Sequence, residues 1–313
     1  MNSQMFEPKK NSAWMSMMIL LGLTFACAFA VQVIVIVGIL ISTGDIKSML
    51  EGGGNSIFSE NTYVLYTILA ASSISTFLLP SVFLQISEKN QYRYFPSEPF
   101  QLKNYLVLIF LFLLVCNPAM ELVSRWNMDM KLPDFLEKTE TWMRSQEDQM
   151  KELTERLVMV DGIGMLMMNL LVMAVIPAIV EEYYFRGALQ NILGRLFKNV
   201  HVAIWVTAII FSAIHVQFYG FFPRMLLGLI FGYAFVWSRN IWVPIFAHFL
   251  NNASVTIIAF VYTRNGKTYE DLQNADPYTI PFYISSIIIS VAIAFYFYKI
   301  SNQKTKTNEL KLD

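Results

Sequence analysis

The sequence predicts an all-α protein, a polytopic integral membrane bundle of about eight transmembrane helices. Of its 313 residues, 55% are hydrophobic and only 15% are charged, whereas a soluble domain carries about 25% charged residues. The mean hydropathy is +0.47, and several apolar runs reach the roughly 20 residues that a helix needs to cross a bilayer. The formal net charge is zero, so no basic surface points to a nucleic-acid partner.

We expect one integral membrane domain over residues 1–313. Its eight predicted spans lie near residues 14–42, 62–85, 104–123, 163–197, 200–218, 221–238, 241–262 and 279–300. The first run is about twice the length of a signal-peptide core, which favours a retained span. The fourth run is too long for one simple span. We expect Pro177 to kink it, and its second half, from Glu182 to Phe197, is amphipathic rather than apolar.

The distribution of Lys and Arg predicts the orientation of the bundle. These residues concentrate in segments that share one side of the membrane, namely 1–13, 86–103, 186–198, 239–240 and 299–313. The short loops on the other side carry only Lys47, Arg224, Arg264 and Lys267. Because cytoplasmic loops are enriched in Lys and Arg, we expect both termini to be cytoplasmic. A bacterial plasma membrane is the expected location.

The segment 124–160 differs from the spans. Six apolar residues recur at spacings of three and four with polar residues between them: Phe135, Trp142, Met143, Met150, Leu153 and Leu157. This pattern predicts an amphipathic helix, extramembrane or lying at the membrane interface. A second interpretation is a cover over the mouth of a cavity. The loop 43–61, with three consecutive glycines, is expected to be flexible, and Cys27 and Cys116 are expected to be buried apolar residues.

Three polar clusters interrupt the apolar second half of the chain. They are Glu181–Arg186, with sequence EEYYFR, Phe211–His215, with sequence FSAIH, and His248–Asn252, with sequence HFLNN. Ionisable groups within a membrane cost several kcal/mol unless they are paired or line a hydrated cavity. The clusters are therefore candidates for a functional site.

Helix geometry allows the clusters to meet. Glu181 and His215 each lie seventeen residues from Lys198, at the turn between two spans, which corresponds to about 25 Å at 1.5 Å per residue. His248 and Asn252 lie about 12 and 18 Å beyond the next turn on the same side. If the turn at Lys198 projects further into the cytoplasm than the next turn on that side, all four side chains come to one level.

Spacing also separates the two adjacent carboxylates. Glu182 and Arg186 are four residues apart on one helix face and are expected to form a structural ion pair. Glu181 points about 100° away and lacks this partner. His248 and Asn252 also share a face. We expect Phe211 to be a packing residue, Asn251 to be an amide on the helix surface and His201 to be interfacial.

The unpaired groups suit the addition of water to a carbonyl. Glu181 is the candidate general base, and His215 can share the proton or hold a water molecule. His248 and Asn252 can donate hydrogen bonds to a developing oxyanion. Neither a Ser nor a Cys has an obvious partner for nucleophilic catalysis, so direct attack by water is favoured.

The motifs Glu-Glu-x-x-x-Arg, Phe-x-x-x-His and His-x-x-x-Asn, in this order on successive spans, resemble the CPBP intramembrane proteases. This family, also called Abi, includes the type II CAAX prenyl proteases and bacteriocin-processing enzymes. The resemblance covers residues 160–256 and is strengthened by Phe185-Arg186-Gly187. It implies Glu181 and His215 as the water-activating pair and His248 with Asn252 as the oxyanion-binding pair. It favours catalysis without a cofactor, while zinc remains an alternative with Glu181, His215 and His248 as ligands.

The expected function is that of an intramembrane endopeptidase. Its partners would be the lipid bilayer and a membrane-associated or leader-type peptide or protein substrate; nothing in the sequence indicates a prenylated one. A non-proteolytic scaffold or bacteriocin-immunity protein would contain the same residues and stays open as an alternative. A transporter is disfavoured because no internal inverted repeat is visible.

Overall fold

The regular structure is helical. A computed structural model describes residues 10–43, 62–273 and 277–309, and among these the only β pairing is an isolated bridge between Ser97 and Asn240. Seven helices in this part of the chain are long and apolar enough to cross a membrane, and the shorter apolar helix Val200–Ala213 accompanies them. The prediction of an all-α membrane bundle with about eight helices is confirmed.

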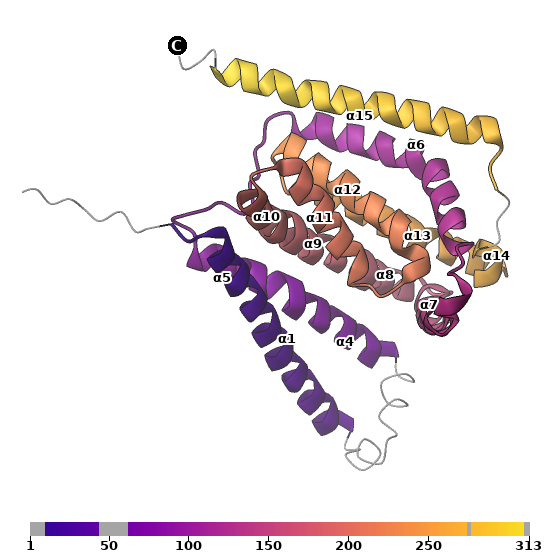
Figure 1. Cartoon of the computed structure of the whole chain (residues 1–313). Helices are drawn as coiled ribbons and strands as arrows, with labels where there is room; N and C mark the ends of the chain where they lie inside the picture. The colour runs from indigo at the N-terminus through magenta and orange to yellow at the C-terminus, as the bar shows by residue number, and fades with distance from the viewer. Residues whose placement is uncertain (1–9, 44–61, 274–276, 310–313) are drawn as a thin grey trace, which may run out of the picture.

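The helices follow the predicted spans closely (Figure 1). In chain order they are α1 (Ala13–Thr43), α4 (Thr62–Ser73), η2 (Ile74–Leu78), α5 (Leu79–Ser87), α6 (Leu102–Met128), η3 (Asp134–Leu136), α7 (Glu137–Val158), α8 (Ile163–Asn169), η4 (Leu170–Val175), α9 (Ile176–Glu182), η5 (Tyr183–Leu189), α10 (Gln190–Phe197), α11 (Val200–Ala213), η6 (Phe218–Gly220), α12 (Phe221–Ser238), α13 (Trp242–Arg264), α14 (Tyr269–Gln273) and α15 (Ile280–Glu309). The expected flexible loop at 43–61 lies almost entirely outside the described residues.

The outer helices expose large apolar side chains. Phe25 and Phe29 on α1 are 74% and 75% exposed, and Ile288 on α15 is 62% exposed. In water such surfaces would drive association, but in a bilayer they face acyl chains as favourably as they would face other side chains. These exposed faces therefore suit helices surrounded by lipid.

The segment 163–197 is one long helix with internal irregularities. It runs through α8, η4, α9, η5 and α10, and η4 and η5 are π-helical. Pro177 lies at the start of α9, directly after η4, so the local change in hydrogen bonding accommodates its missing N–H. At 1.5 Å per residue its 35 residues measure about 52 Å, which exceeds one hydrocarbon core.

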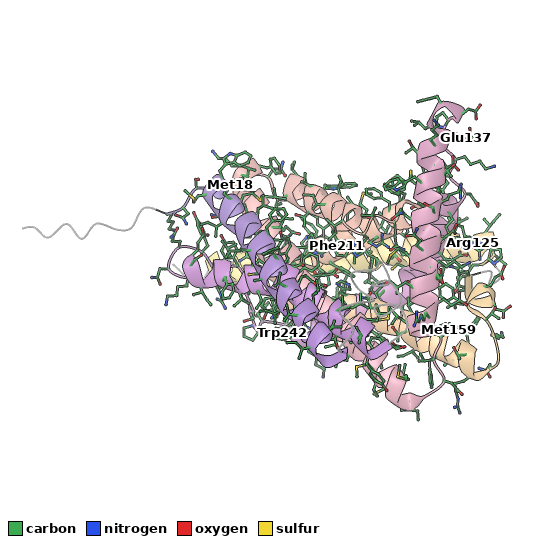
Figure 2. The ribbon with its side chains drawn as sticks, turned by 90° about the horizontal axis from the view of Figure 1, so that it is seen from below. Met18, Arg125, Glu137, Met159, Phe211 and Trp242 are labelled. Carbon is green, nitrogen blue, oxygen red and sulfur yellow. The ribbon has the colours of Figure 1, made fainter. Side chains whose placement is uncertain are left out.

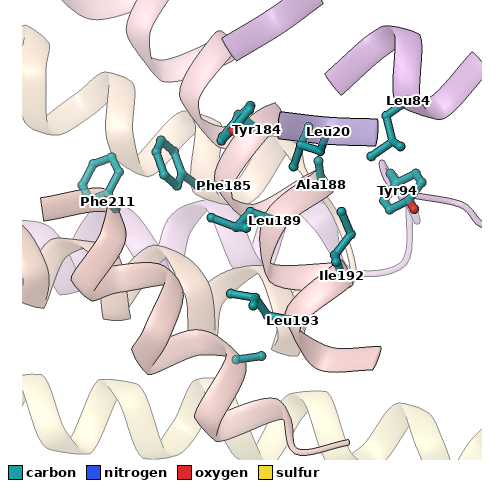
Figure 3. Packing of buried hydrophobic residues seen from close by; sticks show 11 residues of the cluster. Leu20, Leu84, Tyr94, Tyr184, Phe185, Ala188, Leu189, Ile192, Leu193 and Phe211 are labelled. Atoms are coloured by element: carbon teal, nitrogen blue, oxygen red, sulfur yellow. The ribbon is translucent and has the colours of Figure 1, made fainter. Parts of the chain in front are cut away.

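The second half of this helix is buried rather than surface-lying. It packs at the centre of a cluster that joins α1, α5, η5, α10 and α11 (Figure 3), formed by Leu20, Leu84, Tyr94, Tyr184, Phe185, Ala188, Leu189, Ile192, Leu193, Ala203 and Phe211. Three of its polar residues, Glu182, Arg186 and Gln190, are buried too, and each bonds to a neighbouring helix. Gln190, for example, donates to the carbonyl oxygen of Gly232 on α12 at 3.3 Å.

The loops gather at two ends of the bundle. Near one end, Ile241 N donates to Pro96 O at 2.8 Å, and Asn240 Nδ2 donates to Glu98 O at 2.6 Å. At another, Arg264 pairs with Asp161 at 3.1 Å. Each contact joins two segments that the distribution of Lys and Arg assigned to the same side of the membrane. Which side is cytoplasmic stays a prediction.

The amphipathic pattern between 134 and 158 corresponds to η3 and α7. Helix α7 is viewed nearly end-on in Figure 1 and runs crosswise to the bundle in Figure 2, where Glu137 is labelled. Trp142 packs against Phe218 of η6 with ring centroids 5.5 Å apart, and Arg144 lies over the Tyr219 ring at 4.4 Å. Its apolar and aromatic contacts therefore attach α7 to the segment that follows α11.

Candidate active site

One pocket collects the candidate catalytic side chains. It has a volume of about 490 Å³ and lies between α4, η4, α9, the turn after α11, the start of α12, and α13. Its lining residues are Leu69, Ser73, Val172, Met173, Pro177, Glu181, Phe211, His215, Gly220, Pro223, Arg224, Leu227, Phe231, His248, Asn251 and Asn252. The four side chains expected to act together, from three separate helical segments, thus share a single cavity.

Glu182 and Arg186 form the expected ion pair. Arg186 Nη1 donates to Glu182 Oε1 at 2.9 Å, and both side chains are fully buried. Arg186 Nη2 also donates to the carbonyl oxygen of Gly228 at 3.1 Å, and its guanidinium lies 4.7 Å from the centre of the Phe211 ring. A buried pair of this kind locks helices together, because removal of either partner leaves an unpaired charge.

His248 contacts Glu182 rather than Glu181. Its Nδ1 lies 2.8 Å from Glu182 Oε1, and its ring stacks on Phe231 with centroids 5.2 Å apart. A carboxylate held by Arg186 only accepts hydrogen bonds, so we assign the proton to Nδ1 of His248. Nε2 is then the nitrogen available to the pocket. Spacing predicted only Arg186 as the partner of Glu182, because residues on separate helices leave no periodic signal.

Glu181 has no partner of this kind. It lies beside Glu182 on α9, is 9% exposed and lines the pocket. Its Oε2 atom is buried and has no hydrogen-bond partner among the described residues. Oε2 of Glu182 also has no partner among these residues, but Glu182 is held by a cation and an imidazole through Oε1 and does not line the pocket. Of the two consecutive carboxylates, Glu181 is the one that can bind water or substrate there.

His215 lies in a tight turn after α11. Its Nδ1 is 2.8 Å from the carbonyl oxygen of Phe211, which can only accept, so Nδ1 carries the proton and Nε2 is the nitrogen left for the pocket. The next residue, Val216, has φ of 55°. A β-branched residue in the left-handed region costs about 1–2 kcal/mol, and such strain is typical of functional turns.

The two asparagines of α13 form a short chain. Asn251 Nδ2 donates to Asn252 Oδ1 at 3.1 Å, and Asn252 Nδ2 donates to the carbonyl oxygen of Met173 on η4 at 3.1 Å. Both line the pocket, so the surface of α13 on which Asn251 lies is the one that faces the cavity. Residues three and four positions after His248 fall on the same helix face. Each amide nitrogen has two N–H groups, which leaves one of Asn252 for a ligand.

Several residues that line the pocket were not predicted from the sequence. Leu69 and Ser73 of α4 and Phe231 of α12 line the pocket, and nothing in their local sequence distinguishes them from packing residues. Arg224 also lines it, although its sequence position suggested a loop charge. His201, by contrast, is exposed and contacts the Tyr233 hydroxyl at 3.0 Å.

The donor set does not form an evident metal site. Within the part of the chain that the structure describes, no three His, Cys, Asp or Glu side chains are grouped closely enough to hold a metal ion. Glu181, His215 and His248, the ligands considered for zinc, share the cavity without forming such a group. We therefore derive the chemistry from the side chains of this chain alone.

Comparison with known proteins points to membrane proteases. Residues 163–254 match the family model described as type II CAAX prenyl endopeptidase Rce1-like. The chain is 34% identical over 93 residues to the membrane-embedded CAAX protease MroQ of Staphylococcus aureus. It is 27% identical over 117 residues to the putative membrane peptidase YdiL, and 26% identical over 113 residues to YpbD, both of Bacillus subtilis.

The matches cover part of each protein. They take in 27% of this chain for MroQ, 37% for YdiL and 34% for YpbD. The chain spans 36%, 47% and 55% of those relatives. No solved structure matches the chain. The family match begins at the first residue of α8 and ends within α13, so it contains the three polar motifs.

Proposed function

We propose that the chain, whose residues 163–254 match the Rce1-like family of type II CAAX prenyl endopeptidases, is a CPBP-type membrane protease that hydrolyses peptide bonds of membrane-associated or leader-type peptides. The observation that supports this most is one pocket lined by Glu181, His215, His248 and Asn252, in which an oxygen of Glu181 has no partner among the described residues. Such a group can bind and deprotonate water.

In the proposed reaction, the oxygen of a water molecule attacks the peptide carbonyl carbon while Glu181 accepts a proton from that water. The carbon–nitrogen bond then breaks, and the proton held by Glu181 passes to the departing amine. His215 presents Nε2 as an acceptor that orients the water, because its Nδ1 is bound to Phe211. Every atom transferred comes from the water or the peptide, so no covalent enzyme intermediate is required.

The oxyanion would be stabilised by donors on α13. Asn252 retains one N–H after bonding to Met173. His248 presents Nε2 to the pocket because its Nδ1 bonds to Glu182, and an N–H at Nε2 would donate to the same oxyanion. Preorganised donors of this kind contribute about 10²–10³-fold to the rate.

The test compares the wild type with Glu181→Gln. The isosteric amide keeps the shape of the side chain and loses the base, so turnover should be abolished with little change in folding. Membranes from cells producing either form are compared by quantitative peptide mapping, with Glu152→Gln, an exposed carboxylate of α7, as the matched control. Peptides that depend on the wild type should persist in Glu152→Gln and disappear in Glu181→Gln.

Identical peptide profiles for folded wild type and Glu181→Gln would contradict the enzyme and favour the alternative of a non-proteolytic scaffold or immunity protein. The route proposed is metal-free. Activity that survives exhaustive chelation, with no metal found by elemental analysis, would support this route. Activity that is lost on chelation and restored only by added zinc would overturn the metal-free route.

A further inference from the structure

Arg224 is a cation without a carboxylate partner. It lies in the first turns of α12, lines the same pocket as Glu181 and is half-buried. Its Nη2 donates to Gln217 Oε1 at 2.8 Å, while its buried Nη1 has no acceptor. Among the described residues, none places a carboxylate oxygen within ion-pair distance of it. Arg186, the other guanidinium near the pocket, differs in having a carboxylate partner, Glu182 at 2.9 Å, although its Nε also has no acceptor among the described residues.

The surroundings orient Arg224 without neutralising it. Gln217 uses its amide nitrogen to contact Glu147 of α7 at 3.4 Å, so the nearby carboxylate bonds to the amide and not to the guanidinium. Burial raises the pKa of Glu147 and the charge of Arg224 opposes this rise, so the two groups interact electrostatically without an ion-pair contact. On the other side Gly220 leaves space, since a Cβ there would lie 3.3 Å from Arg224 Nη2.

An incompletely satisfied guanidinium is costly in a partly desolvated pocket. It would be relieved by an acceptor of opposite charge that enters with a ligand. Arg is suited to this because its planar fork binds a carboxylate through two parallel hydrogen bonds. Glu181 shares the pocket but is not within 4.0 Å, so it keeps its role as a free base.

We propose that Arg224 binds a carboxylate of the substrate and thereby selects peptides that carry one close to the scissile bond. The carboxylate belongs either to a peptide C-terminus or to an Asp or Glu side chain. This inference rests on the proposed protease function. Gln217 and Gly220 act as positioning residues: the first fixes one edge of the guanidinium, and the second lets it lie against the backbone.

The test measures binding separately from cleavage. The full chain with Glu181→Gln is purified in detergent and exposed to photo-cross-linkable peptides in matched forms. One pair differs in a free or amidated C-terminus, and a second pair has Asp or Asn at internal positions. We expect an acidic form to be captured at least about tenfold better, in line with a charge-assisted hydrogen bond.

Adding Arg224→Gln should reduce the ratio of acidic to neutral peptide captured to about one, and Arg224→Lys should give an intermediate ratio. Arg264→Gln, which removes an exposed cation outside the pocket, should leave it unchanged. Gly220→Ala keeps all charges and shifts the guanidinium by only a few tenths of an ångström, so it should lower the preference slightly. Arg224→Lys carries the test if Arg224→Gln does not fold. If amidation of the peptide C-terminus lowers capture, the bound group is the C-terminal carboxylate. If replacement of Asp by Asn lowers capture, the bound group is a side-chain carboxylate.

Equal capture of acidic and neutral forms, or a preference that survives Arg224→Gln in folded protein, overturns the assignment. The same peptides are then offered to the chain with Glu181 intact. A carboxylate preference without any cleavage would contradict the protease and leave Arg224 as a binding residue. Cleavage without a carboxylate preference would support the protease and contradict the role of Arg224 in binding.

Discussion

At the scale of single residues, Glu181 and Glu182 show how one helical step separates two functions. Glu182 is fully buried and bonds to Arg186 and His248, whereas Glu181 lines the cavity and has no ion-pair partner among the described residues. The difference follows from the 100° rotation per residue of an α-helix. The first carboxylate can therefore exchange protons with a ligand, while the second organises the groups around it.

Glu182→Ala should destabilise the fold. Removing one partner of a buried ion pair costs about 3–5 kcal/mol, because Arg186 is left charged and desolvated. We expect a lower yield and a lower midpoint in thermal unfolding of the purified chain, whereas Glu181→Gln should unfold near the wild-type temperature. The double variant Glu182→Ala with Arg186→Met should recover part of the loss. Stable Glu182→Ala beside an unfolded Glu181→Gln would mean that the two carboxylates have exchanged roles.

At the scale of elements, two glycines let α12 approach its neighbours. Gly228 and Gly232 are four residues apart on one face, the small-xxx-small spacing of closely packed membrane helices. A Cβ on Gly228 would lie 3.1 Å from Ala208 Cα of α11, and one on Gly232 would lie 2.8 Å from Ile204 Cγ2. Their carbonyl oxygens also accept hydrogen bonds from Arg186 and Gln190. The same face thus fixes both α11 and the helix that contains the ion pair.

Gly228→Ala should weaken this packing by about 1–3 kcal/mol, the usual cost of overfilling a tight interface, because the atoms it meets include the backbone of α11. Gly164→Ala is the matched control, since a Cβ at Gly164 has no atom within 4 Å. Thermal unfolding in detergent should show a lower midpoint for Gly228→Ala only. Equal midpoints for both variants would show that α11 and α12 have room to separate.

At the scale of the whole molecule, local sequence predicts what depends on hydropathy and helical spacing. Apolar runs predicted the spans, because a segment that crosses the membrane must form its backbone hydrogen bonds within one helix. Counting residues from Lys198 gave a common depth for Glu181 and His215, and both line the pocket. The pairing of Glu182 with Arg186 followed from their four-residue spacing.

Contacts between helices lay beyond this reasoning. The bond from His248 to Glu182 joins residues 66 positions apart, and the π-helical segments on either side of α9 change the register without a sequence signature. Asn251 and Arg224 were assigned to a surface and a loop, because one sequence does not reveal which neighbour covers a given face. Their presence in the pocket depends on how α12 and α13 dock, which is a tertiary property.

The orientation of the molecule decides from which side a substrate meets Arg224. Lys and Arg counts predict that residue 93 is cytoplasmic and residue 131 is not. We therefore expect a membrane-impermeant maleimide to label Lys131→Cys in intact cells and Arg93→Cys only after permeabilisation; both positions are exposed. The parent chain, with Cys27 and Cys116 inside α1 and α6, gives the background. Lys131 shortly precedes η3 and α7, and α7 contacts Gln217, which bonds to Arg224. This labelling would therefore show that the part of the pocket beside Arg224 faces away from the cytoplasm. The reverse labelling would turn it towards the cytoplasm and contradict the predicted topology.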